Sequence, residues 1–227
     1  MVNGRKGCLR LTGKINTALF DLDGTLINTN ELIISSYLHT LNHYYPGKYG
    51  REDVIPFMGP PLLETFETID KIRAQEMMTM YRAYNIENHD NIVTIFDGVY
   101  DAIKELKERG FKLAIVSTKL SDVVEMGLKL TKLDAFFDVV VALDHVENAK
   151  PDPEPVLLAL EKLKASPSEA IMVGDNKHDI LSGKNAGTLT AGVAWTLKGK
   201  EFLQEYNPDY IFDNMKDILS IPEVQSL

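Results

Sequence analysis

Short apolar runs rich in β-branched residues alternate with longer amphipathic segments along much of the chain. Such runs, bounded by polar or turn residues, are typical of strands. The predicted strands are TALFD (17–21), KLAIVS (112–117), FDVVVAL (137–143), AIMVGD (170–175) and LTAGVAW (189–195). The segments that precede or separate the last four strands have helical patterns. They are GVYDAIKELKERG (98–110), SDVVEMGLKLTKL (121–133), DPEPVLLALEKLK (152–164) and KHDILSGKNAG (177–187).

The order of these elements predicts how they pack. Near-continuous apolar strands separated by helices indicate a parallel sheet that is covered by helices on both faces. The segment 98–110 places Val99, Ile103 and Leu106 on one helical face, and Gly110 follows where a helix stop is expected. The sequence therefore predicts an α/β fold.

The segment 30–95 interrupts this alternation, because it contains helical patterns and no convincing strand. Its first helix is predicted to begin near Asn28, with Glu31 three residues later in a capping box, and to end before Pro46. The apolar stripe of this helix is Ile33, Tyr37, Leu41 and Tyr44. The methionines that follow have helical spacing and are expected in a core rather than in a ligand site. We expect an inserted helical lobe.

Composition limits the classes of function. The 227 residues, 44% of them hydrophobic, suffice for one sizeable core and a second small lobe. A formal net charge of -9 argues against a nucleic-acid or anionic-membrane surface. Cys8 is the only cysteine, so an internal disulfide and a cysteine-based metal cluster are excluded, as fits a reducing compartment.

The sequence contains neither a predicted membrane span nor a predicted signal peptide. No apolar run reaches the roughly 18 residues that a membrane span needs. Residues 1–16 are basic but lack the apolar centre of a signal peptide. We expect these residues to form a loose tail without a function, and we expect a cytoplasmic protein.

Candidate chemistry begins at the end of the first predicted strand, where Asp21 and Asp23 precede Gly24. Ligands of parallel α/β sheets bind outside the carboxyl ends of the strands. Two carboxylates there fit a hard-cation site, because oxygen ligands suit Mg²⁺ and a divalent ion reduces their mutual repulsion. The same tetrapeptide is also compatible with a solvated turn, so the two interpretations stay open at this point.

Three further predicted strand ends carry polar residues. Ser-Thr-Lys (117–119) follows one strand, Lys150 follows another within KPDPEP, and Asp175 and Asp179 follow a third. Taken singly, each has an ordinary explanation: a helix-cap region, a solvated lysine, and acidic residues that complement a helix dipole. Only their combination points to a shared site.

Together DLDGTL, AIVST, KPDPEP and GDNKHD resemble the ordered motifs of the haloacid dehalogenase (HAD) phosphohydrolase superfamily. The resemblance covers residues 17 to about 215. It implies a Rossmann-like core with a parallel sheet, formed by 17–29 and 96–227, and an inserted α-helical cap, formed by 30–95.

The resemblance also implies a role for each motif residue. Asp21 would be the nucleophile that becomes an aspartyl phosphate, and Asp23 the general acid and base. Ser117 and Lys150 would bind the phosphoryl oxygens. Mg²⁺ would be held by Asp21, the backbone carbonyl of Asp23 and Asp175, with Asp179 in a supporting contact. Further substrate-binding residues would be Gly24, Thr25, Thr118, Lys119 and Asn28.

Longer stretches resemble phosphoglycolate phosphatases and the bacterial PpaX-type inorganic pyrophosphatases, a group associated with the HPr kinase/phosphorylase system. They are FDLDGTLINTNELI, LHTLNHYYPG, YRAYN, VEMGLKL, KPDPEP, GDNKHDI, NAGT and WTLKG. Several lie in the predicted cap, where substrate choice in this family usually resides. The resemblance therefore favours a cytoplasmic, Mg²⁺-dependent pyrophosphatase with a small phosphorylated substrate.

Two alternatives remain at the level of the sequence. A phosphatase for a small organic monoester such as phosphoglycolate, or a phosphomutase, would keep the same core residues. A catalytically silent binding protein could share the fold, although the intact motif set argues against it.

One position departs from many relatives: Asn28 stands where they carry Asp. It could face the leaving group and avoid repulsion, or it could simply cap a helix. The candidates for contact with a leaving phosphate are Lys119, Lys177, His178 and Lys198.

Overall fold

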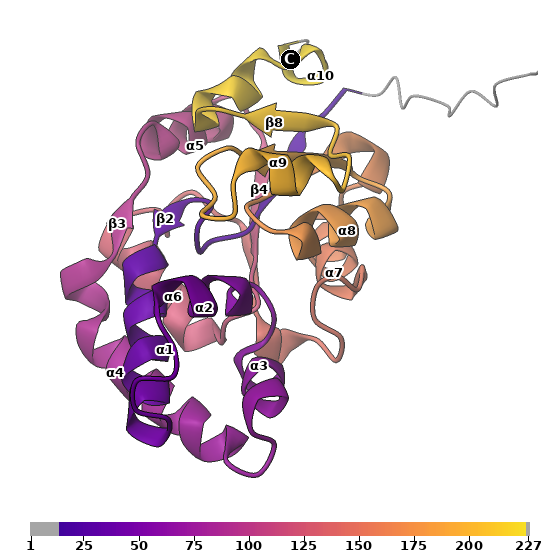
Figure 1. Ribbon diagram of the computed structural model, residues 1–227. Helices are drawn as coiled ribbons and strands as arrows, with labels where there is room; N and C mark the ends of the chain where they lie inside the picture. Colours follow the sequence, from indigo (N-terminus) through magenta and orange to yellow (C-terminus); the bar gives the residue numbers. More distant parts are fainter. Residues whose placement is uncertain (1–13, 226–227) are drawn as a thin grey trace, which may run out of the picture.

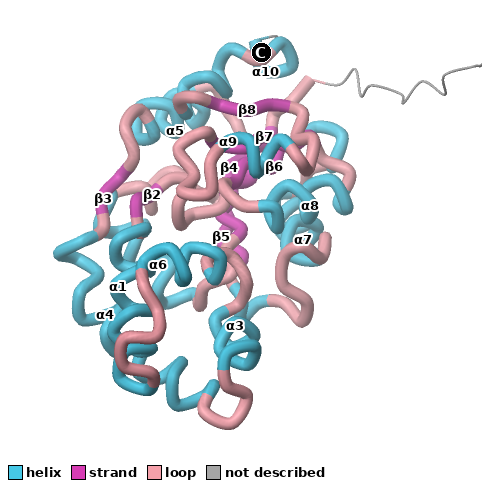
Figure 2. Tube along the Cα trace, in the orientation of Figure 1, coloured by secondary structure: helices cyan, strands magenta, loops and turns pink. Residues whose placement is uncertain are grey.

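A six-stranded sheet forms the centre of the molecule in the computed structural model, which describes residues 14–225 (Figures 1 and 2). All its strands pair in parallel, in the order β5-β4-β1-β6-β7-β8. The strands are β1 (Thr17–Phe20), β4 (Lys112–Val116), β5 (Val139–Val141), β6 (Ala170–Gly174), β7 (Leu189–Val193) and β8 (Tyr210–Phe212). The α/β fold and the five strands predicted from the sequence are confirmed.

Alternate residues of the strands pack against opposite layers of helices. In β1, Ala18 and Phe20 belong to one apolar cluster and Leu19 to the other. This period of two places an apolar side chain on each face of the sheet, which explains why the strand sequences are almost continuously hydrophobic. The sheet is therefore buried on both sides.

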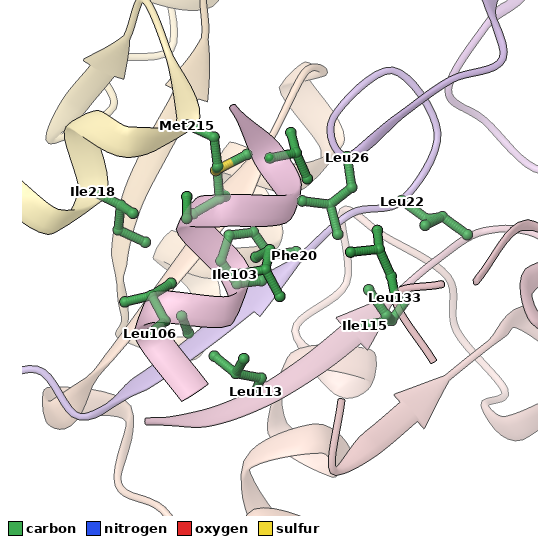
Figure 3. Close-up of a cluster of buried hydrophobic side chains, with 14 of the residues drawn as sticks. Phe20, Leu22, Leu26, Ile103, Leu106, Leu113, Ile115, Leu133, Met215 and Ile218 are labelled. Atoms are coloured by element: carbon green, nitrogen blue, oxygen red, sulfur yellow. The ribbon is translucent and has the colours of Figure 1, made fainter. Parts of the chain in front are cut away.

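The four helices that the periodicity predicts within 98–187 form most of the two layers. One layer contains α5 (Val99–Glu108), α6 (Ser121–Thr131) and the short α10 (Pro222–Gln225). The other contains α7 (Glu154–Leu163) and α8 (Lys177–Ala186), and α9 (Lys200–Gln204) lies beside β7. The short α9 and α10 were not predicted. Figure 3 shows the first layer, where Ile103 and Leu106 of α5 pack against Phe20, Leu113 and Ile115 of the sheet.

A separate helical lobe, defined here as residues 30–92, lies at the foot of the molecule in Figure 1. It contains α1 (Asn30–Tyr44), α2 (Arg51–Val54), α3 (Leu62–Ile69) and α4 (Ala74–Ile92). These helices have their own apolar cluster, which includes Tyr37, Phe66, Met77 and Tyr81. The predicted core role of the methionines is confirmed for Met77 and Met78, whereas Met80 is half-buried and lies outside this cluster. Two short antiparallel strands, β2 (Ile27–Asn28) and β3 (Thr94–Ile95), lie where the chain enters and leaves the lobe.

Some local predictions are wrong. Helix α1 begins at Asn30, two residues after Asn28, but its cap residue is Thr29 and Glu31 does not close a capping box. Instead the Glu31 carboxylate accepts two hydrogen bonds from Arg51, a tertiary ion pair that the local pattern could not indicate.

The structure also adds elements and contacts to those predicted. Strands β2, β3 and β8 were not foreseen, since runs of two or three residues are too short to show a period. Within the predicted N-terminal tail, Ile15 is buried in the core, whereas Cys8 lies outside the described residues. No helix within residues 14–225 is both long enough and apolar enough to cross a membrane.

Candidate active site

A pocket lies between the carboxyl ends of the sheet strands and the helical lobe. Its sheet-side wall, called here the acidic wall, carries Asp21, Asp23, Asp175, Asp179 and Lys150. The opposite wall, called the lobe wall, comes from α1, α4, the first residue of α3 and the segment before it. It consists of Ile33, Tyr37, Met58, Gly59, Pro60, Leu62, Tyr81, Arg82 and Asn85. Residues separated by more than a hundred positions in sequence therefore share one pocket.

The loop after β1 brings its two carboxylates to the pocket. The Asp21 amide donates to the carbonyl of Val173, so the residue is still held by the sheet. Between Asp21 and Asp23, the Leu22 side chain points into the apolar core (Figure 3). Gly24 has φ +78°, and a Cβ added there would lie 2.6 Å from Asp175 Oδ2. Only glycine combines this left-handed backbone with so close an approach.

Lys150 is the buried cation of the acidic wall. Its Nζ lies 2.7 Å from Asp21 Oδ1 and 2.6 Å from Asp179 Oδ1, and it also donates to the carbonyl of Val116. Burial lowers the pKa of Lys150, but the Asp179 and Asp21 carboxylates outweigh it and raise the pKa above its ordinary value. The ammonium stays charged and links the ends of β1 and β4 to the first turn of α8.

The carboxylates of Asp21, Asp175 and Asp179 form a cluster that fits a divalent cation. One oxygen of each lies within 4.8 Å of the others, and oxygen is the donor that hard cations prefer. Burial, with further contributions from Asp179 and Asp23, raises the pKa of Asp21 to about 7 against the opposing effect of Lys150. Burial, with further contributions from the Asp21 and Asp179 carboxylates, also raises the pKa of Asp175. A single lysine therefore does not balance these buried charges, whereas an added divalent cation would.

Asp23 has a different partner. The Lys119 ammonium lies 2.7 Å from Asp23 Oδ1, and both side chains are mostly buried. The loop that carries Lys119 is held by a bond from its amide to Ser117 Oγ, at 3.1 Å. Lys119 was expected to touch a leaving phosphate, and the structure does bring it to the pocket, paired there with a carboxylate.

Three side chains of the sheet domain donate hydrogen bonds to two consecutive backbone carbonyls of the lobe. Asn176 Nδ2 and Lys198 Nζ donate to the Met58 carbonyl at 3.1 and 2.7 Å, and Thr118 Oγ1 donates to the Gly59 carbonyl at 3.2 Å. Gly59 has φ +118°, and a Cβ there would collide with Asn176 at 2.4 Å. The segment 58–59 is thereby held across the mouth of the pocket.

Not every sequence-predicted residue lines the pocket. Thr25 is completely buried, and Ser117 is 5% exposed without lining it. Asn28 does not line the pocket. Its Oδ1 accepts a hydrogen bond from the Asn30 amide at 3.3 Å, but the cap position of α1 is occupied by Thr29. Lys177 and Lys198 line an adjacent hollow.

His178 lies between the two spaces and lines both of them. Burial lowers its pKa to about 4, so its ring is neutral near pH 7. It is therefore a hydrogen-bonding group rather than a cation for a bound anion.

The lobe wall contains polar residues that sequence reasoning did not single out. Tyr81, Arg82 and Asn85 lie on the pocket-facing side of α4. Their sequence signal is the stretch YRAYN (81–85), which belongs to the longer resemblance but assigns no role to any single residue. Nothing in its spacing indicates which side of the helix meets the sheet.

Comparisons with known proteins show the family to which the chain belongs. A model of the haloacid dehalogenase-like hydrolase family matches residues 18–193, a span that includes every residue of both walls. A protein of Bacillus velezensis named Pyrophosphatase PpaX is 60% identical over 212 residues, covering 93% of this chain and 98% of its own. Another of the same name, from Anoxybacillus flavithermus, is 61% identical over 212 residues and covers 93% and 99%.

A solved structure is similar over both units of the fold. A haloacid dehalogenase-like family hydrolase from Streptococcus pneumoniae aligns with a TM-score of 0.81 at 27% identity, covering 91% of this chain and 97% of that one. The helical lobe and the sheet thus occur together in that hydrolase as well.

Proposed function

Because the chain belongs to the haloacid dehalogenase-like hydrolase family, we propose that it hydrolyses inorganic pyrophosphate to phosphate with Mg²⁺ as its cofactor. The observation that carries the chemistry is the buried Asp21–Lys150–Asp179 contact with Asp23 in the same pocket. The substrate is supported by the two relatives named pyrophosphatases, at 60% and 61% identity over nearly the whole chain.

In the first step, a carboxylate oxygen of Asp21 forms a bond to one phosphorus of pyrophosphate. The bond from that phosphorus to the bridging oxygen breaks, and Asp23 donates a proton to the leaving phosphate. The product on the protein is an aspartyl phosphate at Asp21. In the second step, water attacks the same phosphorus, Asp23 takes the proton from that water, and the Asp21 carboxylate is regenerated with a second phosphate.

Fixed positive charge supports both steps. Lys150 is held by Asp21 and Asp179, so its ammonium is already in place beside the nucleophile and needs little reorganisation. Ser117 holds the adjoining loop through the Lys119 amide, and its hydroxyl is proposed to donate to a phosphoryl oxygen. Thr118 and the backbone around Gly24 and Thr25 complete this side of the substrate site.

The cation would be held by the Asp21 and Asp175 carboxylates and the Asp23 backbone carbonyl, with Asp179 in support. When bound, Mg²⁺ would neutralise part of the negative charge on the phosphate oxygens of the substrate. Asp21 must then act as an ionised nucleophile. The hydrogen bond from Lys150 orients one oxygen of Asp21, and the other oxygen would form the bond to phosphorus.

Residues 30–95, which comprise the helical lobe and β3, are proposed to act as a mobile cap, with 17–29 and 96–227 as the core. The side-chain contacts to the Met58 and Gly59 carbonyls hold the lobe against the sheet. Opening at these contacts would admit substrate, and closure would exclude water from the aspartyl phosphate until the second step.

A substrate panel tests the proposal. Phosphate release is measured from pyrophosphate, phosphoglycolate and a nucleoside monophosphate, each with and without Mg²⁺. We expect the highest kcat/KM for pyrophosphate and dependence on Mg²⁺. A higher kcat/KM for phosphoglycolate would replace the substrate and retain the mechanism, whereas no release from any of the three would favour a binding protein.

A further inference from the structure

We propose that Arg82 of α4 binds the leaving phosphate of pyrophosphate and thereby selects a charged leaving group. This inference rests on the proposed function and assigns its substrate discrimination to one side chain of the lobe wall. Arg82 is partly buried and lines the pocket together with Asp21, Asp23 and Lys150 of the acidic wall.

The neighbours of Arg82 fix the orientation of α4. Tyr81 is 6% exposed and packs on Tyr37, with ring centroids 4.8 Å apart. Asn85, three residues after Arg82, donates from Nδ2 to Ser36 Oγ at 3.1 Å within the interior of the lobe. Residues three apart lie on the same side of a helix, so these contacts hold Arg82 toward the pocket rather than toward solvent.

The other cations of the pocket are already engaged. Lys119 pairs with Asp23, and Lys150 pairs with both Asp21 and Asp179. Arg82 has no ion pair among the residues that the structure describes. Unlike Lys119 and Lys150, Arg82 therefore has no carboxylate partner among the described residues. Its guanidinium is available to bind an anion.

The charge distribution also determines where a second phosphate is favoured. The acidic wall carries four carboxylates, and the transferred phosphoryl group is balanced there by Lys150 and the proposed cation. A leaving phosphate would be repelled by the remaining acidic groups and attracted to the lobe wall. The planar guanidinium of Arg82 can donate two parallel hydrogen bonds to two phosphate oxygens, a geometry that lysine cannot reproduce.

The experiment compares two substrates with different leaving groups in the full-length protein. Pyrophosphate has a charged leaving phosphate, whereas phenyl phosphate has a leaving group without a second phosphate. For Arg82→Gln we expect kcat/KM for pyrophosphate to fall about 10- to 100-fold, the loss typical of a charge-assisted hydrogen bond. We expect less than about a threefold change for phenyl phosphate, and an intermediate loss for pyrophosphate in Arg82→Lys.

Arg73→Gln is the matched control, since Arg73 lies at the start of the same helix, is half exposed and pairs with Asp70 outside the pocket. It should leave both substrates unchanged. A binding measurement independent of turnover uses methylenediphosphonate, a non-hydrolysable analogue. Its inhibition constant should rise about 10-fold or more in Arg82→Gln and stay constant in Arg73→Gln.

The outcomes separate the inference from the proposed function. If the wild-type protein prefers pyrophosphate but Arg82→Gln loses equal activity on both substrates, or on neither, the inference is wrong and the function stands. If the wild-type protein does not prefer pyrophosphate, the proposed function fails and the inference fails with it. Thermal denaturation of each variant shows whether a loss of activity reflects unfolding. If Arg82→Gln is destabilised, the two substrates are compared in Arg82→Lys, which keeps the charge and most of the side-chain volume.

Discussion

The two walls of the pocket differ in the polarity of their side chains. The acidic wall gathers four carboxylates and one buried lysine from the ends of strands that the sheet holds in register. The lobe wall is mostly apolar and aromatic, with Tyr37 and Tyr81 packed into the separate cluster of the lobe. One wall concentrates charge at a cost to stability, and the other gains stability from burial.

This difference indicates a division of labour. Charged groups that must not move relative to one another are placed at the carboxyl edge of the sheet, and the strands before Asp21 and Asp175 each pair with a neighbour on both sides. Groups that would select the leaving group are placed on a lobe that touches the sheet side through few polar contacts. Substitutions in the two walls should therefore affect different measured quantities.

The largest effect is expected at the nucleophile of the acidic wall. Asp21→Asn keeps the side-chain volume but removes the attacking oxygen, so kcat should fall by about 10⁴-fold or more. Phosphate release under substrate saturation measures it. Activity within tenfold of the wild-type protein would rule out a covalent step at Asp21.

The second prediction separates Asp23 from the cation site. Asp23→Asn removes the proton donor and acceptor, for which a loss of about 10²- to 10⁴-fold in kcat is expected. Mg²⁺ affinity, measured by calorimetry, should change little because the proposed ligand at this position is the backbone carbonyl. Complete loss of Mg²⁺ binding would show that the carboxylate itself is a ligand.

The third prediction concerns the cation. Asp175→Ala removes one oxygen of the acidic cluster, so the Mg²⁺ concentration for half-maximal rate should rise about 10- to 100-fold. Asp122→Ala, an exposed position on α6, is the control and should leave the requirement unchanged. An unaltered requirement in Asp175→Ala would remove this residue from the ligand set.

The fourth prediction concerns how far the ionised acidic wall lowers folding stability in metal-free buffer. The folded pKa of Asp21, about 7, exceeds its ordinary value of 3.8, so the folded state binds its proton more tightly than the unfolded state. The stability that this group contributes is present below pH 3.8 and is lost as the pH rises through 7. Asp21→Asn cannot ionise and should have the higher Tm at pH 8, with a smaller difference at pH 5. A lower Tm for the variant at pH 8 would contradict this assignment.

The smallest effect is expected outside both walls, at Asn28. Asn28→Ala removes the acceptor for the Asn30 amide and should cost about 0.5–1 kcal/mol of folding free energy. The ratio of kcat/KM for pyrophosphate to that for phenyl phosphate should stay constant, because Asn28 does not line the pocket. A changed ratio at an unchanged Tm would return Asn28 to the substrate site.

The acidic wall was largely readable in the sequence. Asp21 and Asp175 each follow a strand whose apolar run is plain, and parallel strands bring their carboxyl ends to one edge. The four motifs therefore predicted a common site, and the structure brings Asp21, Asp179 and Lys150 into direct contact. The local pattern was sufficient because the sheet converts sequence order into spatial proximity.

The lobe wall was not readable in this way. The stretch 81–85 has the pattern of any helix with one buried side, and only the packing of α4 against α1 and α3 turns Arg82 toward the pocket. The pairing of Lys119 with Asp23 spans 96 positions, and the hydrogen bond from Lys198 to Met58 spans 140. Hydrophobic periodicity carries no information on contacts of this range.

The sequence by itself determined the strands, the long helices and the residues available for chemistry, because these depend on side-chain type and on periods of two or 3.6 residues. Only the tertiary structure decided which cation is paired with which carboxylate, that Glu31 meets Arg51 instead of capping its own helix, and which helix face closes the pocket. Such pairings depend on which residues, distant in sequence, are brought together and buried. That is determined only when the lobe packs onto the sheet.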